Sequence, residues 1–190
     1  LGAYNAQMGF GLPSIGGKDS MSGTFDDEHG EINVPPTLVS FAVDVNSCKN
    51  IITPEFKKAG SKIVEFKINR DNYDLPDYAQ IMDGYGKLFE DIKAGKILSA
   101  YAVEGRGAAE AVSKMAFGNK MGVKIEHNVD PRDFFGAGWG NIVCEVAEGK
   151  VGELSIPYTV LGEVTDKGVF EYGNTVITMD EALAGWMKTL

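Results

Sequence analysis

The spacing of apolar residues along the chain predicts a succession of short strands and helices. Helical spacing marks four segments, at residues 1–10, 75–92, 108–117 and 180–188. Runs with strand character occupy residues 37–45, 62–68, 97–103, 122–125, 141–146, 158–161 and 169–178. Strands and helices alternate after residue 60, and several strands are close enough in sequence to pair antiparallel. From Gly60 onward the pattern predicts an α+β fold, a mixed α/β sandwich.

Three of these segments carry more detailed expectations. The run at 37–45 is almost continuously apolar, which is typical of a buried strand. The strand at 62–68 alternates lysine or glutamate with apolar residues, so one of its faces is expected to meet solvent. The helix at 75–92 is expected to open at Asp74, with Pro76 tolerated in its first turn. Its apolar stripe is expected to contain Leu75, Tyr78, Ile81 and Met82.

The composition changes between Asn46 and Gly60, where polar residues replace the apolar run. A domain boundary is therefore expected there, with one part at 1–50 and a second part at 51–190. The chain opens inside a helical pattern without a capping residue and stops abruptly after another. These ends predict a piece of a larger enzyme that is not a complete catalyst by itself.

Composition and charge narrow the classes of partner. The 190 residues are 44% hydrophobic and 24% charged, an ordinary globular balance. The formal net charge of −9, without any run of Lys or Arg, argues against nucleic acid and anionic membranes as partners. No apolar stretch has the length that spans a bilayer and no signal peptide opens the chain, so a cytoplasmic location is expected.

The two cysteines, Cys48 and Cys144, are far apart and lie in apolar runs. They lack the C-x-x-C spacing of zinc or redox sites, so two buried free thiols are expected. His29 and His127 are too isolated to form a base–nucleophile pair with either cysteine.

The glycine-rich stretch at 11–20 is the first candidate for chemistry. Gly16 and Gly17 let a backbone approach a ligand closely, and Lys18, Asp19 and Ser20 add a cation, a metal ligand and a hydrogen-bonding group. The phosphate-loop pattern G-x-x-x-x-G-K-[ST] is not met, because residue 12 is leucine and residue 19 is not a hydroxyl residue. As a bare pattern, the stretch fits an ordinary turn equally well.

The second candidate is the strand-to-helix junction at 103–109. A helix N-terminus with free amides suits an anion, and Arg106 would add positive charge. The alternative, which the pattern favours, is that Gly105 and Gly107 serve close helix–strand packing. The acidic residues at 26–31 miss the spacing of calcium loops, so solvation is the expected reading.

Several motifs together resemble the second synthetase repeat of the phosphoribosylformylglycinamidine synthase family, within the aminoimidazole ribonucleotide synthetase superfamily. They are the Gly-Lys-Asp-Ser-Met sequence at 17–21, the Pro-Pro-Thr-Leu sequence at 35–38, Thr-Pro at 53–54, the segment 110–123 and the strand at 140–146. The end of the chain, 179–190, is similar to the segment just before the glutaminase domain in the long form of that enzyme. The resemblance covers nearly the whole chain.

The resemblance implies a C-terminal-type synthetase domain preceded by the tail of an N-terminal-type half. The full enzyme would use ATP, Mg²⁺ and ammonia from glutamine to convert formylglycinamide ribonucleotide to formylglycinamidine ribonucleotide. By this resemblance Gly17 and Lys18 would contact the nucleotide and Ser20 the substrate. Lysine cannot ligate Mg²⁺, so the metal role would pass to Asp19. The catalytic histidine and most of the ATP cleft would lie in other synthetase domains, and ammonia would come from the glutaminase domain. The isolated chain is therefore expected to be inactive.

One segment departs from the family pattern. Where the repeat typically carries aspartates before its Ala-rich helix, this chain has Ala102 and Gly105. A non-catalytic repeat, which completes a pseudo-twofold core and docks the glutaminase domain, is therefore the alternative reading.

Overall fold

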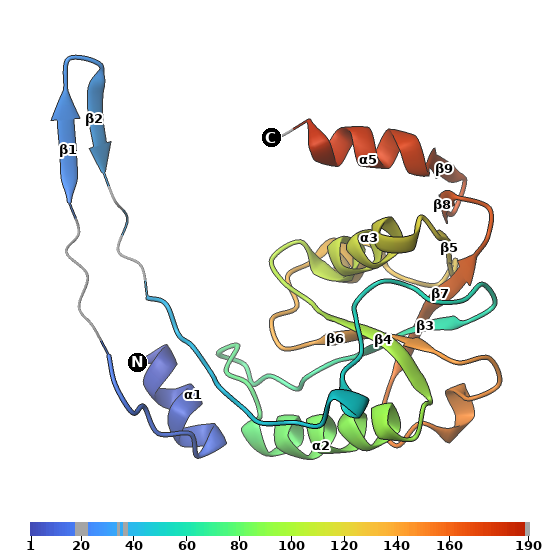
Figure 1. Cartoon of the computed structure of the whole chain (residues 1–190), viewed down its shortest axis with the longest axis horizontal. Helices are drawn as coiled ribbons and strands as arrows, with labels where there is room; N and C mark the ends of the chain where they lie inside the picture. The colour runs from blue at the N-terminus through green and yellow to red at the C-terminus, as the bar shows by residue number, and fades with distance from the viewer. Residues whose placement is uncertain (18–22, 34, 36–37, 189–190) are drawn as a thin grey trace. The chain divides into compact units, whose positions relative to one another are not determined.

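The computed structural model describes residues 1–17, 23–33, 35 and 38–188. The chain divides into two compact units, Leu1–Asn46 and Ser47–Leu190, each of which is described by itself (Figure 1). Most of the regular structure belongs to the second unit.

Over its described residues, the first unit contains one helix and one hairpin. Helix α1 (Gly2–Phe10) ends at Gly11, whose φ of 65° is the left-handed conformation that favours glycine at a helix C-terminus. Strands β1 (Thr24–Asp27) and β2 (Gly30–Asn33) pair antiparallel, so the acidic residues at 26–31 belong to a hairpin. All eight of its strand residues are exposed.

The apolar run expected as a buried strand forms no strand over its described part, 38–45. Its large side chains are exposed by 64% to 95%: Leu38, Val39, Phe41, Val43 and Val45. A strand is defined by hydrogen bonds to a neighbour, and no described residue pairs with this segment. The expectation of a buried strand is therefore wrong over these described residues, because an apolar composition alone supplies neither a pairing partner nor a cover.

The second unit is built on a seven-stranded sheet with the strand order β4-β6-β3-β7-β5-β8-β9. The strands are β3 (Lys62–Phe66), β4 (Ile97–Ala102), β5 (Gly122–Ile125), β6 (Ile142–Val146), β7 (Thr159–Thr165), β8 (Val169–Tyr172) and β9 (Thr175–Thr178). Every neighbouring pair is antiparallel except β5 and β8, which are parallel. The sheet confirms the predicted α+β fold and the expected antiparallel pairing of several strands.

Helices cover both faces of this sheet (Figure 1). On one face α2 (Tyr78–Lys93) contributes Leu88 to a core with Phe66 and Cys144. On the other face α3 (Gly107–Asn119) contributes Met115 to a core that also contains Ile63. Helices α4 (Pro131–Phe135) and α5 (Met179–Met187) extend this second layer through Phe134, Met179 and Leu183.

Two buried carboxylates fasten loops to this framework. Glu145 on β6 is fully buried and accepts hydrogen bonds from the backbone amides of Lys57 and Lys58, at 2.8 and 2.9 Å, and from Ser99 Oγ at 2.8 Å. Asp91 on α2 accepts from Lys96 Nζ at 2.8 Å and from the Ser155 amide at 2.7 Å. Several hydrogen-bond donors replace the water that each carboxylate loses on burial, which offsets the free-energy cost of desolvation.

Three local expectations are wrong. Strand β3 has no solvent face, because Glu65 is 3% exposed beneath neighbouring segments. Helix α2 begins at Tyr78, since the Asp77 carboxylate accepts from the Gln80 amide at 3.1 Å and caps the helix. Its buried stripe is therefore Ile81, Gly84, Leu88 and Asp91, while Leu75 and Met82 are exposed.

Of the two cysteines, only Cys144 is buried, and burial raises the pKa of its thiol to about 12. Cys48 is exposed in a short 3₁₀ turn, Cys48–Asn50. Among the described residues, none of the helices combines the length and the apolar character that crossing a bilayer requires.

Candidate functional site

The glycine-rich loop begins at the end of α1 and is described as far as Gly17. Both Gly16 and Gly17 are exposed, and a Cβ atom added at either position would have no atom within 4 Å. Packing among the described residues therefore does not require glycine at these two positions. Three of the expected site residues, Lys18, Asp19 and Ser20, lie outside the described residues.

The β4–α3 junction is organised by close packing. Gly107 has a φ of 73°, and a Cβ atom at this position would overlap the carbonyl oxygens of Phe134 and Gly136. The Glu104 carbonyl accepts from the amides of Gly107 and Gly138, both at 3.2 Å, which ties the junction to the segment after α4. Only glycine fits at residue 107, so close packing, here against the segment 134–136, accounts for this glycine, whereas a Cβ atom at residue 105 would meet only the Trp139 ring, at 3.4 Å.

No metal centre is formed by the part of the chain that the structure describes, in which no three His, Cys, Asp or Glu side chains are grouped to hold an ion. The acidic hairpin uses some of its polar side chains locally. Asp27 Oδ1 accepts from the His29 amide at 2.8 Å, and Glu31 Oε1 accepts from Asn33 Nδ2 at 2.6 Å. The hairpin thus fits the expected solvated role.

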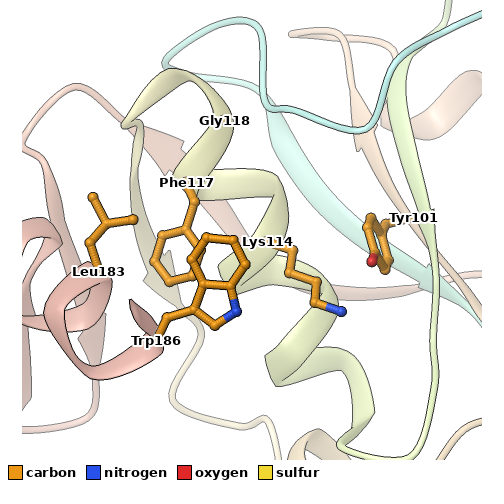
Figure 2. Close-up of a pocket in the computed structure, with 6 residues that line it drawn as sticks. All are labelled: Tyr101, Lys114, Phe117, Gly118, Leu183 and Trp186. Carbon is orange, nitrogen blue, oxygen red and sulfur yellow. The ribbon is translucent and has the colours of Figure 1, made fainter. Parts of the chain in front are cut away.

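A cavity of about 420 Å³ lies between β4, α3 and α5 (Figure 2). Its walls are formed by Tyr101, Lys114, Phe117, Gly118, Leu183 and Trp186. The rings of Phe117 and Trp186 are stacked, with centroids 5.4 Å apart and an angle of 23° between their planes. This stacking joins α5 to α3 and presents a largely apolar wall.

Lys114 is the one charged group among the residues lining this cavity. Its Nζ lies 2.9 Å from Glu110 Oε1. It also lies 5.5 Å from the centroid of the Tyr101 ring, and Figure 2 shows both of these cavity side chains. The hydrogen bond to Glu110 raises the pKa of Lys114 and lowers that of Glu110, so both remain charged at neutral pH. The six lining residues include no carboxylate, histidine or cysteine, and they offer ring faces and one cation without an acid–base pair.

Sequence reasoning did not identify this cavity. Lys114 and Phe117 fall in the helix predicted at 108–117, Gly118 in the segment noted for its family resemblance, and Trp186 in the helix predicted at 180–188, but nothing in the sequence linked these segments. The cavity brings together three segments separated by 13 to about 65 residues, so local periodicity carries no signal for it.

No family model matches the sequence. Solved structures do share its fold. The crystal structure of phosphoribosylformylglycinamidine synthase II from Thermotoga maritima superposes with a TM-score of 0.58 at 13% identity, over 80% of this chain and 28% of that one. Thermotoga maritima PurL complexed with AMPPCP gives 0.57 at 13% identity, over 80% and 28%. The same protein complexed with FGAR gives 0.56 at 13% identity, over 78% and 29%.

At this level of identity the likeness concerns the fold. The α+β fold of the aminoimidazole ribonucleotide synthetase type, expected from the sequence, is confirmed. The chain covers less than a third of the length of these structures. Its fold is therefore that of a part of the Thermotoga maritima synthase.

Proposed function

We propose that this chain is a fragment of an ATP-dependent C–N ligase that converts formylglycinamide ribonucleotide to formylglycinamidine ribonucleotide in purine biosynthesis in the cytoplasm. The observation that carries the proposal is the shared fold, over about 80% of the chain, with a synthase whose structures include complexes with AMPPCP and FGAR. The motifs at 17–21 and 35–38, which resemble the same family, are an independent support from the sequence.

In this proposal the loop that begins at Gly17 contributes to a nucleotide and substrate site. Gly17 and Lys18 contact the nucleotide, Asp19 holds Mg²⁺ and Ser20 contacts the substrate. The open space around Gly16 and Gly17 supports this assignment, because glycines without a packing reason suit a backbone that approaches a ligand. Other synthetase domains supply the remainder of the ATP cleft, and a glutaminase domain supplies ammonia. The isolated chain then has no synthetase activity.

The test is kinetic and uses the longer protein that carries this chain. Asp19→Ala and Ser20→Ala are each expected to lower kcat/KM for formylglycinamide ribonucleotide by about 100-fold or more, as removal of charge-stabilising groups does in other enzymes. Asp26→Ala, on the exposed hairpin, is the matched control and leaves the rate unchanged. Near-normal kinetics of both loop variants would overturn the proposal.

A non-catalytic repeat is the second candidate function, and one observation favours it. The junction at 101–107 lacks the aspartates of the family pattern, and its Gly107 is required by packing against the segment after Phe134. In that case the domain completes a pseudo-twofold core and docks a glutaminase domain. The same loop variants distinguish the two candidates, since a structural repeat predicts no kinetic change.

Calorimetric titration of the chain itself measures nucleotide binding directly. Binding of Mg²⁺-AMPPCP that Asp19→Ala abolishes would mean that the loop binds nucleotide without other domains. Binding that persists in Asp19→Ala would contradict the metal role given to this carboxylate.

A further inference from the structure

A second cavity, of about 350 Å³, lies where β3 ends and β7 begins. It differs from the first cavity in that six of its seven lining residues are polar: Glu65, Lys67, Asn69, Gln80, Pro157, Tyr158 and Thr159. Its volume is within the range of sites that hold small molecules. Nothing in the proposed synthetase function uses it.

Glu65 forms the buried, anionic part of this cavity. Its side chain is 4% exposed, and its Oε1 accepts from Asn141 Nδ2 at 2.8 Å. Its Oε2 lies 3.7 Å from Lys67 Nζ, which is beyond hydrogen-bonding distance. Burial raises the pKa of Glu65, because the carboxylate exchanges water for too few donors. One oxygen of a buried carboxylate therefore lacks a close donor among the described residues.

Lys67 supplies the matching cation and is also loosely held. Its Nζ lies between two carboxylates, 3.7 Å from Glu65 Oε2 and 3.4 Å from Asp133 Oδ2. Close ammonium–carboxylate hydrogen bonds are about 2.7–2.9 Å long, so neither contact is a tight pair. The Lys67 side chain is 40% exposed and is free to turn toward a bound anion without breaking a close bond.

The neutral side chains divide into a rigid wall and unused hydrogen-bonding groups. Gln80 shapes the wall, since its Oε1 accepts from the Asn69 amide at 3.1 Å and its Nε2 donates to the Lys67 carbonyl at 3.2 Å. Three other polar groups make no hydrogen bond to any described residue: the side-chain amide of Asn69 and the hydroxyls of Tyr158 and Thr159. These three groups are available to a ligand.

We propose that this cavity binds a small zwitterion of the α-amino acid class, whose ammonium group is held by Glu65 and whose carboxylate is held by Lys67. Such a ligand places a donor on the carboxylate oxygen that lacks one and an acceptor on the loosely held ammonium group. A simple amine would pair with Glu65 but would leave the Lys67 ammonium without an anion and would place a second positive charge beside it. A simple carboxylate would pair with Lys67 but would leave the Glu65 carboxylate without a donor and would place a second negative charge beside it. The two opposite charges therefore select a ligand that carries both.

The experiment is a titration of the ¹⁵N-labelled chain followed by NMR, with three probes of similar size: L-alanine, ethylamine and propionate at matched ionic strength. L-alanine is expected to shift the amides of residues 65–69 and 157–159 in a saturable way. Ethylamine and propionate, each lacking one charged group, are expected to bind about tenfold or more weakly. Equal binding of the three probes, shifts elsewhere in the chain, or no saturation by L-alanine would each overturn the proposal.

Variants identify the two charged groups. Glu65→Gln keeps an acceptor for Asn141 and is expected to weaken L-alanine binding about tenfold or more, as is Lys67→Met. The matched controls are Glu163→Gln and Lys62→Met, which alter a second glutamate–lysine pair, between β7 and β3, whose charged atoms lie 2.9 Å apart and outside the cavity. Controls that weaken binding as much as the cavity variants would contradict the assignment. The wild-type shift map tests the site even where a variant fails to fold.

Discussion

Gly84 on α2 lies directly against the ring of Phe66 on β3, so closely that a Cβ atom at residue 84 would overlap the ring. Phe66 is fully buried, and the Tyr85 ring is tilted against it at a centroid distance of 6.1 Å. Phe66 belongs to a packed core, so a shift of its ring would disturb neighbouring side chains. This contact fixes how near α2 approaches the sheet.

Gly84→Ala is therefore expected to lower the free energy of unfolding by about 1–3 kcal/mol, because the added methyl group overpacks the helix–sheet contact. Gly86 is the matched control, since it lies on the same helix with nothing within 4 Å of an added Cβ. Gly86→Ala is expected to raise stability by about 0.5–1 kcal/mol through helix propensity. Urea denaturation of the three proteins checks both signs, and equal effects of the two changes would contradict the packing argument.

Glu145→Ala is expected to cost about 3–5 kcal/mol of unfolding free energy. The change leaves the backbone amides of Lys57 and Lys58 without their acceptor in a buried place. Ser99→Ala removes one donor and leaves both amides bonded, so it is expected to cost only about 0.5–1.5 kcal/mol. Hydrogen exchange adds a local measurement: in Glu145→Ala the amides at 57 and 58 lose protection, whereas in Ser99→Ala they keep it.

Asp91 predicts a loss of stability in acid. Burial acts to raise its pKa, but the hydrogen bonds from Lys96 and Ser155 outweigh burial and hold the pKa below its ordinary value. A lowered folded-state pKa gives stability that is present above the unfolded pKa, near 3.9, and is lost as pH falls through the folded value. Asp91→Asn is expected to be about 1–3 kcal/mol less stable than wild type at pH 7, with a difference that shrinks below about pH 4. A difference that does not change between pH 7 and pH 3 would contradict this assignment.

For Glu65 the expected change of stability with pH has the opposite sign. Burial raises its folded-state pKa, so the folded protein binds a proton more tightly than the unfolded chain. The resulting stability is fully present below the unfolded pKa, near 4.3, and is lost as pH rises through the folded value. Glu65→Gln removes this dependence. Its stability relative to wild type is expected to rise between pH 4 and pH 7, and thermal unfolding across that range is the measurement.

Local chemistry allowed much of the second unit to be anticipated from the sequence. The strands near 97–103 and 141–146, the helix near 108–117 and the last helix were each placed by apolar spacing, and all form. The start of α2 was missed because Asp74 and Asp77 both resemble caps, and only Asp77 binds the amide of Gln80. Helix α4 was missed although Asp130 and Pro131 form an N-terminal signal, because it is only five residues long.

The sites were harder to predict because they depend on residues distant in sequence. Glu65 looked like a solvent-facing strand residue, but it is buried and accepts a hydrogen bond from Asn141, 76 positions away. Gly107 fitted either an anion site or close packing, and the carbonyls of Phe134 and Gly136 decide for packing. The sequence pattern does not show which carboxylate is enclosed, because periodicity predicts the two faces of a strand but not the segments that cover each face.

The apolar segment at 38–45 has a consequence for the behaviour of the chain in concentrated solution. The six residues 38–43 include no charged residue and no proline. They include the exposed side chains of Val39 and Phe41, two residue types that favour strands. Such windows are typical of segments that stack between molecules into cross-β aggregates. The net charge of −9 opposes this through repulsion between copies, and salt screens that repulsion. The colloidal stability of the chain is therefore a balance between one short exposed segment and the charge of the whole molecule.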